Sequence, residues 1–96
     1  MKTIKYYRQL LSRYKPELIK KYHVRQLAIF GSFARGDETQ ASDLDILVDF
    51  DRPIGLDFVA LADELESRLG VKVDLVSAKA VKPRMMDCIK NELIYV

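Results

Sequence analysis

The sequence has few of the features that mark extracellular or membrane proteins. Cys88 is the only cysteine among 96 residues, which excludes an internal disulfide and a zinc site built from cysteines. The amino-terminal segment MKTIKYYRQLLSRYK never forms an uninterrupted apolar run, so we expect neither a signal peptide nor a membrane span. These observations favour a cytoplasmic protein.

An excess of charge of one sign is also lacking. Sixteen Lys and Arg residues against fourteen Asp and Glu residues leave a net charge of +2, which is too small to indicate nucleic-acid binding by itself. The nucleotide-binding motifs GxxxxGK(S/T) and GxGxxG are absent. Internal repeats, low-complexity tracts and linkers are absent as well, so we expect residues 1–96 to form one domain.

What the chain does contain is an informative stretch from residue 30 to residue 50, FGSFARGDETQASDLDILVDF. Polar and apolar residues alternate from Asp43 onward. This is the period of a strand, so Asp43 and Asp45 project to the same side, about 7 Å apart along the backbone. Two carboxylates on one strand face can hold the same pair of divalent cations. Magnesium is the expected ion because it prefers oxygen ligands, a few carboxylates together with substrate phosphates.

Gly31 and Ser32 directly follow the apolar run LAIF, and ten residues separate Ser32 from Asp43. A glycine lets a phosphate approach the backbone, and a serine hydroxyl can bond to it. We expect a short helix over residues 32–35 whose free N–H groups face an anion, with Gly36 as its carboxyl-terminal cap. Ser32 as a simple helix N-cap is the competing interpretation, and the two are compatible.

The remaining pattern predicts an α+β fold with a small mixed sheet of three to four strands flanked by helices, in the order α-β-α-β-α-β-α. Pro16 is expected to separate two amino-terminal helices. A strand at the Gly-Ser turn should pair antiparallel with the strand that Asp43 opens. The carboxyl-terminal residues 94–96 are expected to form a packed tail or an edge strand. The expected helices cover residues 3–14, 16–22 and 58–69 and a segment from Pro83, and the expected strands cover 27–30, 43–50 and 71–76.

A third carboxylate, Asp74, lies inside the strand expected over residues 71–76, where acidic residues are depleted. Like charges placed together reduce stability unless a cation offsets them, so we add Asp74 to the metal-binding set. Asp49 shares the strand face of Asp43 but lies too far along it, and we expect it to be solvated or salt-bridged. The basic residues of the carboxyl-terminal stretch are expected to form a solvated face, with phosphate steering or partner binding as alternatives: Lys79, Lys82, Arg84 and Lys90.

The strings GSFARG and SDLDILVDF, at this spacing, resemble the signature of the nucleotidyltransferase superfamily of the DNA polymerase beta type. The likeness is greatest to its smallest members, the minimal nucleotidyltransferase (MNT) domains, and covers nearly the whole chain. It implies a polymerase beta palm-like fold. It also implies that Arg35 shapes the loop or approaches phosphate, whereas surface pairing with Asp37 is the simpler alternative.

The function expected from these residues is magnesium-dependent transfer of AMP from ATP. The catalytic set would be Asp43, Asp45 and Asp74, which also hold the ions. One of two ions would activate an acceptor hydroxyl and the other would stabilise the leaving pyrophosphate. The nucleotide-binding set consists of Gly31, Ser32 and Arg35 at the Gly-Ser turn together with Asp43 and Asp45.

The acceptor is a separate question. The resemblance implies pairing with a helical HEPN-type partner, with the MNT protein as antitoxin that modifies a tyrosine of the partner. Two alternatives stay open: an antitoxin that only occludes its partner, and an enzyme acting on a small molecule, as in aminoglycoside nucleotidyltransferases. Oligomeric state is also open. Candidate partner contacts are Tyr6, Tyr7, Leu10 and Tyr95.

Overall fold

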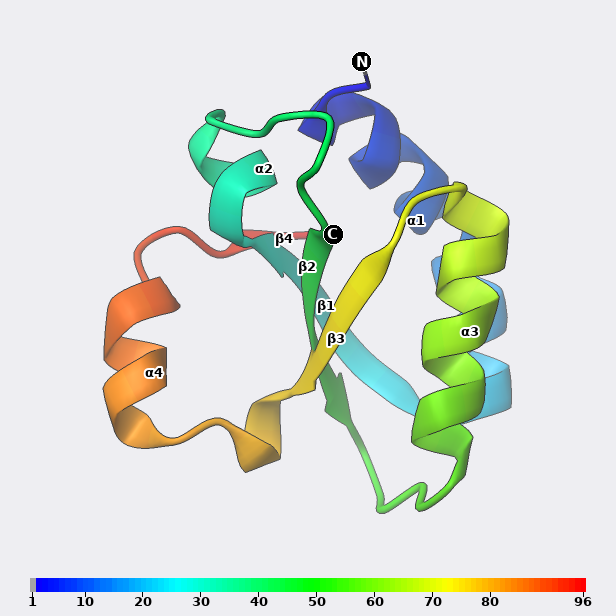
Figure 1. Cartoon of the computed structure of the whole chain (residues 1–96). Helices are drawn as coiled ribbons and strands as arrows, with labels where there is room; N and C mark the ends of the chain where they lie inside the picture. The colour runs from blue at the N-terminus through cyan, green and yellow to red at the C-terminus, as the bar shows by residue number, and fades with distance from the viewer. Residues whose placement is uncertain (1) are drawn as a thin grey trace.

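The computed structural model describes residues 2–96 and has the predicted alternation of helices and strands (Figure 1). The carboxyl-terminal edge strand expected from the sequence is present as β4. In chain order the elements are α1 (Ile4–Tyr22), β1 (Val24–Phe30), α2 (Gly31–Arg35), β2 (Leu44–Phe50), α3 (Asp57–Leu69), β3 (Val73–Ser77), the 3-10 turn η1 (Ala78–Ala80), α4 (Pro83–Ile89) and β4 (Ile94–Tyr95).

The four strands form one mixed sheet in the order β3-β2-β1-β4. As predicted, β1 and β2 are antiparallel, with Phe30 opposite Asp45. β3 is parallel to β2, with Asp74 beside Asp45, because α3 carries the chain back along the sheet between these two strands. The carboxyl end of β1 and the amino ends of β2 and β3 therefore meet at the same end of the sheet.

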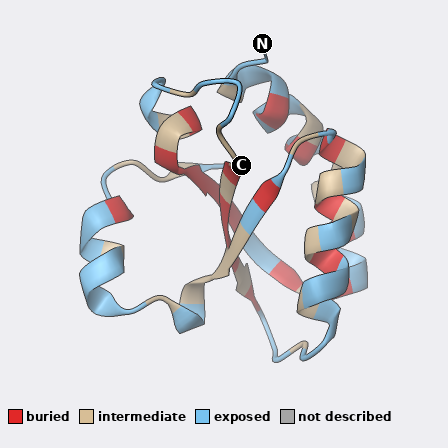
Figure 2. Ribbon diagram, in the orientation of Figure 1, coloured by how far each residue is buried: buried red, intermediate tan, exposed pale blue. Residues whose placement is uncertain are grey.

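Helices cover the two faces of the sheet unequally. α1 and α3 lie together on one side, and the shorter α4 lies on the other (Figure 1). The larger core is enclosed by α1 and α3, and their buried stripes face the sheet in Figure 2. A smaller cluster under α4 contains Ala28, Phe30, Leu47 and Ile89. The larger core thus takes Leu44, Ile46, Val48 and Phe50 of β2, and the smaller cluster takes Leu47, as the strand period of the sequence predicted.

The expectation of two amino-terminal helices is wrong. α1 runs from Ile4 to Tyr22 without interruption and contains Pro16. Proline removes one helical hydrogen bond, but Leu11 and Leu18, on either side of it, are both fully buried in the same core. Burial of both side chains holds the two halves in one helix. The helix ends at His23, which has left-handed backbone angles and donates its N–H to the carbonyl of Ile19.

The strand boundaries differ from the expected ones by one to three residues. β1 begins at Val24 rather than at residue 27, and Asp43 lies one residue before β2. β3 begins at Val73 rather than at residue 71 and extends through Ser77. The chain leaves α3 through the left-handed Gly70 and needs two further residues to reach the sheet, which displaces the start of the strand.

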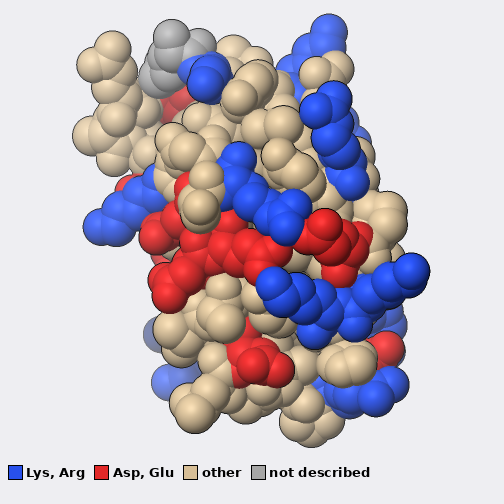
Figure 3. All heavy atoms as spheres, turned by 90° about the vertical axis from the view of Figure 1, so that its right-hand side faces the viewer, with Lys and Arg blue, Asp and Glu red and all other residues tan. Residues whose placement is uncertain are grey.

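Charged side chains link α1 to α3 on the face shown in Figure 3, where acidic residues form a band with basic residues on both sides. Glu64 accepts hydrogen bonds from Lys21 at 2.8 Å and from the hydroxyl of Tyr22 at 2.7 Å, and it pairs with Arg68 at 3.0 Å. Arg68 also pairs with Glu17. This face therefore carries interleaved charges that join two helices. Within residues 2–96, no helix combines the length and the apolar character needed to cross a membrane.

Candidate active site

Two glycines and a buried phenylalanine fix the position of the turn between β1 and α2. Gly31 opens α2 with a φ of +76°, and Gly36 closes it with a φ of +82°, donating its N–H to the Ser32 carbonyl at 2.9 Å. Between them, Phe33 is buried and packs edge-on against Tyr7 of α1, with 5.4 Å between ring centroids. These contacts place the half-buried Ser32 at the end of the sheet where the carboxylates lie.

The sheet register brings the three predicted carboxylates together. Asp45 is the second residue of β2 and lies opposite Phe30, the residue before Gly31. Asp74 of β3 is its neighbour on the other side. Asp43 is the residue directly before β2, and its negative charge is close enough to raise the pKa of the Asp45 carboxyl. Two of these strands are far apart in the sequence, so only the sheet creates the cluster.

Asp45 packs directly on Gly31. A Cβ atom at position 31 would lie 2.0 Å from Oδ2 of Asp45, which is less than any real contact of this kind. Glycine is therefore required at position 31 for two reasons: its positive φ and the space taken by the carboxylate. The turn and the metal-binding candidate form one packed unit.

The electrostatics of Asp45 show the effect of this crowding. Partial burial raises the pKa of the Asp45 carboxyl to about 6, and the negative charges of Asp74 and Asp43 add to the rise. The positive charge of Arg35 opposes it. A divalent cation would relieve the repulsion and favour the ionised form.

The residues fit a magnesium ion that also needs ligands from its substrate. No group of three His, Cys, Asp or Glu side chains in the described part of the chain is arranged as a complete metal site. Magnesium binds through one or two carboxylates together with substrate phosphates, so an incomplete protein ligand set agrees with this ion. Asp43 and Asp45 would supply the protein oxygens and the nucleotide the others, with Asp74 beside them.

Glu92 is a residue of this site that the sequence analysis missed. Its Oε1 atom accepts a hydrogen bond from the Gly31 N–H at 2.9 Å, and its Oε2 atom accepts one from Nη1 of Arg35 at 3.2 Å. Arg35 also donates to Asp37 at 3.1 Å, the pairing considered as an alternative from the sequence. Hydrogen bonds to Asp37 and Glu92 raise the pKa of the Arg35 guanidinium. The only sequence signal near Glu92 was the apolar segment 94–96. It predicted a packed tail or an edge strand, but not the strand with which it pairs.

Other candidate residues lie outside the cluster. Asp49 accepts from Nε of Arg25 at 2.9 Å, as the salt-bridge expectation had it. The basic carboxyl-terminal residues are exposed: Lys79, Lys82, Arg84 and Lys90.

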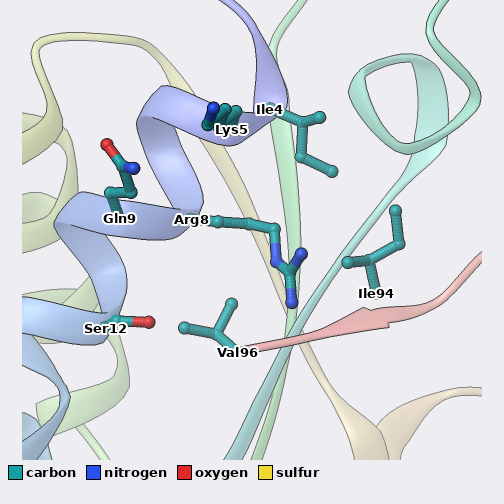
Figure 4. A pocket seen from close by; sticks show the side chains of 7 residues that line it. All are labelled: Ile4, Lys5, Arg8, Gln9, Ser12, Ile94 and Val96. Atoms are coloured by element: carbon teal, nitrogen blue, oxygen red, sulfur yellow. The ribbon is translucent and has the colours of Figure 1, made fainter.

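A cleft of about 500 Å³ lies between α1 and β4 (Figure 4), and none of the predicted site residues lines it. Arg8 extends across the cleft and donates to the Tyr95 carbonyl at 3.1 Å. That bond occupies an outward backbone group of the edge strand. The cleft does not belong to the carboxylate site.

A Gly-Ser turn at the end of one strand and an Asp-x-Asp pair at the start of its antiparallel neighbour define a nucleotidyltransferase of the polymerase beta type. The family model described as "Nucleotidyltransferase domain" matches residues 11–96. The chain belongs to this family of enzymes, among its minimal, MntA-like members.

Curated relatives agree along the whole chain. A provisionally named protein adenylyltransferase, MJ0128 of Methanocaldococcus jannaschii, is 47% identical, and the match covers 100% of both chains. Protein adenylyltransferase MntA of Thermococcus cleftensis is 38% identical, with coverage of 100% of this chain and 98% of the relative.

Two solved structures share the fold. One, provisionally described as a minimal nucleotidyltransferase, has 36% identity and a TM-score of 0.74, covering 91% of this chain and 92% of that chain. The other is a tri-AMPylated HEPN toxin of Shewanella oneidensis in complex with its MNT antitoxin, with 21% identity and a TM-score of 0.65, covering 91% of this chain and 69% of that chain. At that identity the second likeness shows the fold alone.

Proposed function

We propose that the chain works as a single-domain, magnesium-dependent nucleotidyltransferase that transfers AMP from ATP to a tyrosine hydroxyl of a HEPN-type partner protein, and so acts as its antitoxin. The observation that carries the proposal is the packing of Asp45 against Gly31 with Asp74 and Asp43 beside it. This unit combines an acidic cluster suited to a dication with the Gly-Ser turn that opens α2.

The residues divide the work by position. Asp43 and Asp45 would hold magnesium, which supplies positive charge to the triphosphate and acidifies the acceptor hydroxyl. The Ser32 hydroxyl and the backbone amides of α2 that follow Gly31 orient the phosphates. Asp74, on the outer strand, accepts the proton of the acceptor hydroxyl. The acceptor oxygen then bonds to the α-phosphorus while the bond to the β-phosphate breaks, and pyrophosphate leaves.

A protein acceptor is favoured by how little of this chain surrounds the site. Asp74 is exposed, and Asp45 is only half-buried. Transfer requires the attacking oxygen to be held about 3–3.5 Å from phosphorus, and a partner protein can supply the missing wall together with the hydroxyl. The name of the Thermococcus cleftensis relative, a protein adenylyltransferase, supports this class of acceptor.

Partner contacts are best sought among exposed aromatic residues. Tyr6 of α1 and Tyr95 of β4 expose 38% and 51% of their surface. Tyr7, proposed from the sequence as another contact, is buried against Phe33 and belongs to the core, and the half-buried Leu10 packs against the same core.

The test is transfer of label from α-labelled ATP with magnesium, with the chain alone and with a HEPN-type protein of the same organism as the candidate partner. We expect little pyrophosphate release by the chain alone and AMP on a partner tyrosine in the mixture, located by mass spectrometry. Neutralisation of the partner without label would establish the occluding antitoxin instead. Rapid transfer by the isolated chain to an aminoglycoside or a simple alcohol would establish the small-molecule enzyme.

A further inference from the structure

The carboxyl-terminal segment reaches the catalytic turn through one side chain, that of Glu92. Two contacts hold its backbone: its N–H donates to the Ile89 carbonyl at 3.0 Å, and β4 follows with Ile94 opposite Ile29 of β1. Two residues before Ile94 and two residues after Ile29, the same antiparallel register places Glu92 beside Gly31. The position of Glu92 is therefore set by the pairing of β4 with β1.

The side chain of Glu92 connects the first and last residues of α2. One oxygen accepts from the Gly31 N–H at 2.9 Å and the other from Arg35 at 3.2 Å, so a single carboxylate spans both ends of α2. Its side chain is only 19% exposed. The first N–H groups of a helix have no partner within the helix, and a carboxylate there is bound by a charge-assisted hydrogen bond.

Glu92 affects the carboxylate cluster of Asp43, Asp45 and Asp74 indirectly, through the residues that it holds. Gly31 packs against Asp45, so the carboxylate that holds Gly31 also limits the position of Asp45. Arg35 is held by the same carboxylate, at the opposite end of α2 from Gly31. Within residues 2–96, the Glu92 side chain forms no hydrogen bond with Asp45 or Asp74.

We propose that Glu92 is a positioning residue of the nucleotidyl-transfer site, which holds Gly31 and Arg35 so that Ser32 and Asp45 keep their mutual geometry. This inference rests on the proposed transfer function. It also assigns a role to the Gly31 amide: that N–H is taken by Glu92, so the phosphates are left with Ser32 and the amides that follow it.

The test compares Glu92→Ala with Glu92→Gln, because a glutamine oxygen can still accept from the Gly31 N–H while the charge is lost. Asp87→Ala is the matched control, since Asp87 is an exposed carboxylate of the preceding helix α4 that pairs with Lys90 at 3.5 Å. We expect Glu92→Ala to lower kcat about 10- to 100-fold, as loss of a supporting partner of a ligand typically does, with KM for ATP within about threefold of wild type. Glu92→Gln should recover most of that loss, and Asp87→Ala should match wild type.

Amide hydrogen exchange without nucleotide gives a readout that is independent of activity. Glu92→Ala should accelerate exchange at Gly31 and through α2, and Glu92→Gln should restore protection. If the wild type transfers no AMP, the proposed function fails while the exchange result still decides the role of Glu92. Unchanged α2 exchange would overturn the inference. So would a lower KM for ATP with unchanged kcat, which would show that Glu92 competes with phosphate, or a uniform loss of stability with normal kcat.

Discussion

Oδ2 of Asp45 occupies the space where a side chain at position 31 would begin, 2.0 Å from the Cβ that Gly31 lacks. The Gly-Ser turn and the carboxylate of Asp45 are thus packed directly against each other. The pairing of Phe30 with Asp45 across β1 and β2 brings them into contact.

Gly31→Ala tests this relationship against Gly36→Ala. Both glycines have positive φ, but a Cβ at Gly36 meets nothing within 4 Å. Gly36→Ala, the control, should lower the free energy of unfolding by roughly 1–2 kcal/mol, the cost of placing a side chain on a residue with left-handed backbone angles. Gly31→Ala should lose more stability in urea unfolding and should also abolish AMP transfer, because Asp45 is displaced. Equal stabilities and normal transfer in both variants would show that the close approach is unimportant.

Asp45 should make the metal-free protein less stable above pH 6. Its folded-state pKa of about 6 exceeds its ordinary value of 3.8, so the unfolded chain releases this proton more readily. The stability associated with the protonated carboxyl is complete below about pH 3.8 and is lost as pH rises through 6. Asp45→Asn should therefore melt at a higher temperature than wild type at pH 7.5 without divalent ions, with the difference vanishing near pH 4. A difference that does not depend on pH would contradict the raised pKa.

The double substitution Asp43→Asn with Asp45→Asn should remove the magnesium dependence of ATP binding, because both proposed protein ligands lose their charge. Asp49→Asn is the matched control: it lies on the same face of β2 but pairs with Arg25. Calorimetry with and without magnesium measures the effect. If the double variant retains the magnesium dependence of wild type, other residues hold the ion.

Asp74 and Ser32 should separate chemistry from binding. Asp74→Asn removes the proposed proton acceptor and should slow transfer about 100- to 10,000-fold while ATP affinity changes little. Ser32→Ala removes a phosphate contact and should mainly weaken ATP binding. Single-turnover rates and ATP titrations on both variants distinguish the two effects, and parallel losses in each would refute this division of roles.

Much of the site could be predicted because its signals are local. The alternation from Asp43 to Phe50 determined which residues share a face, and the structure shows the corresponding two cores. Gly31, Ser32 and Gly36 indicated the short helix, since turn and cap positions restrict residue type. The apolar residues Tyr7, Leu11, Tyr14 and Leu18 keep a helical period through Pro16, but the burial of Leu11 and Leu18 that carries α1 across the proline is a tertiary effect.

What the sequence by itself determined was the class of site: a Gly-Ser turn followed at a set distance by two carboxylates on one strand face. Asp74 was expected in this set from its place inside a strand, but only the tertiary structure shows how it and the distant Glu92 join the site. Asp74 becomes the neighbour of Asp45 through the parallel pairing of β3 with β2, and Glu92 reaches Gly31 through the pairing of β4 with β1. The antiparallel pairing of β1 with β2 could be expected from the sequence. The complete strand order and the register depend on how the helices close over the sheet, and a chain read residue by residue contains no local signal for them.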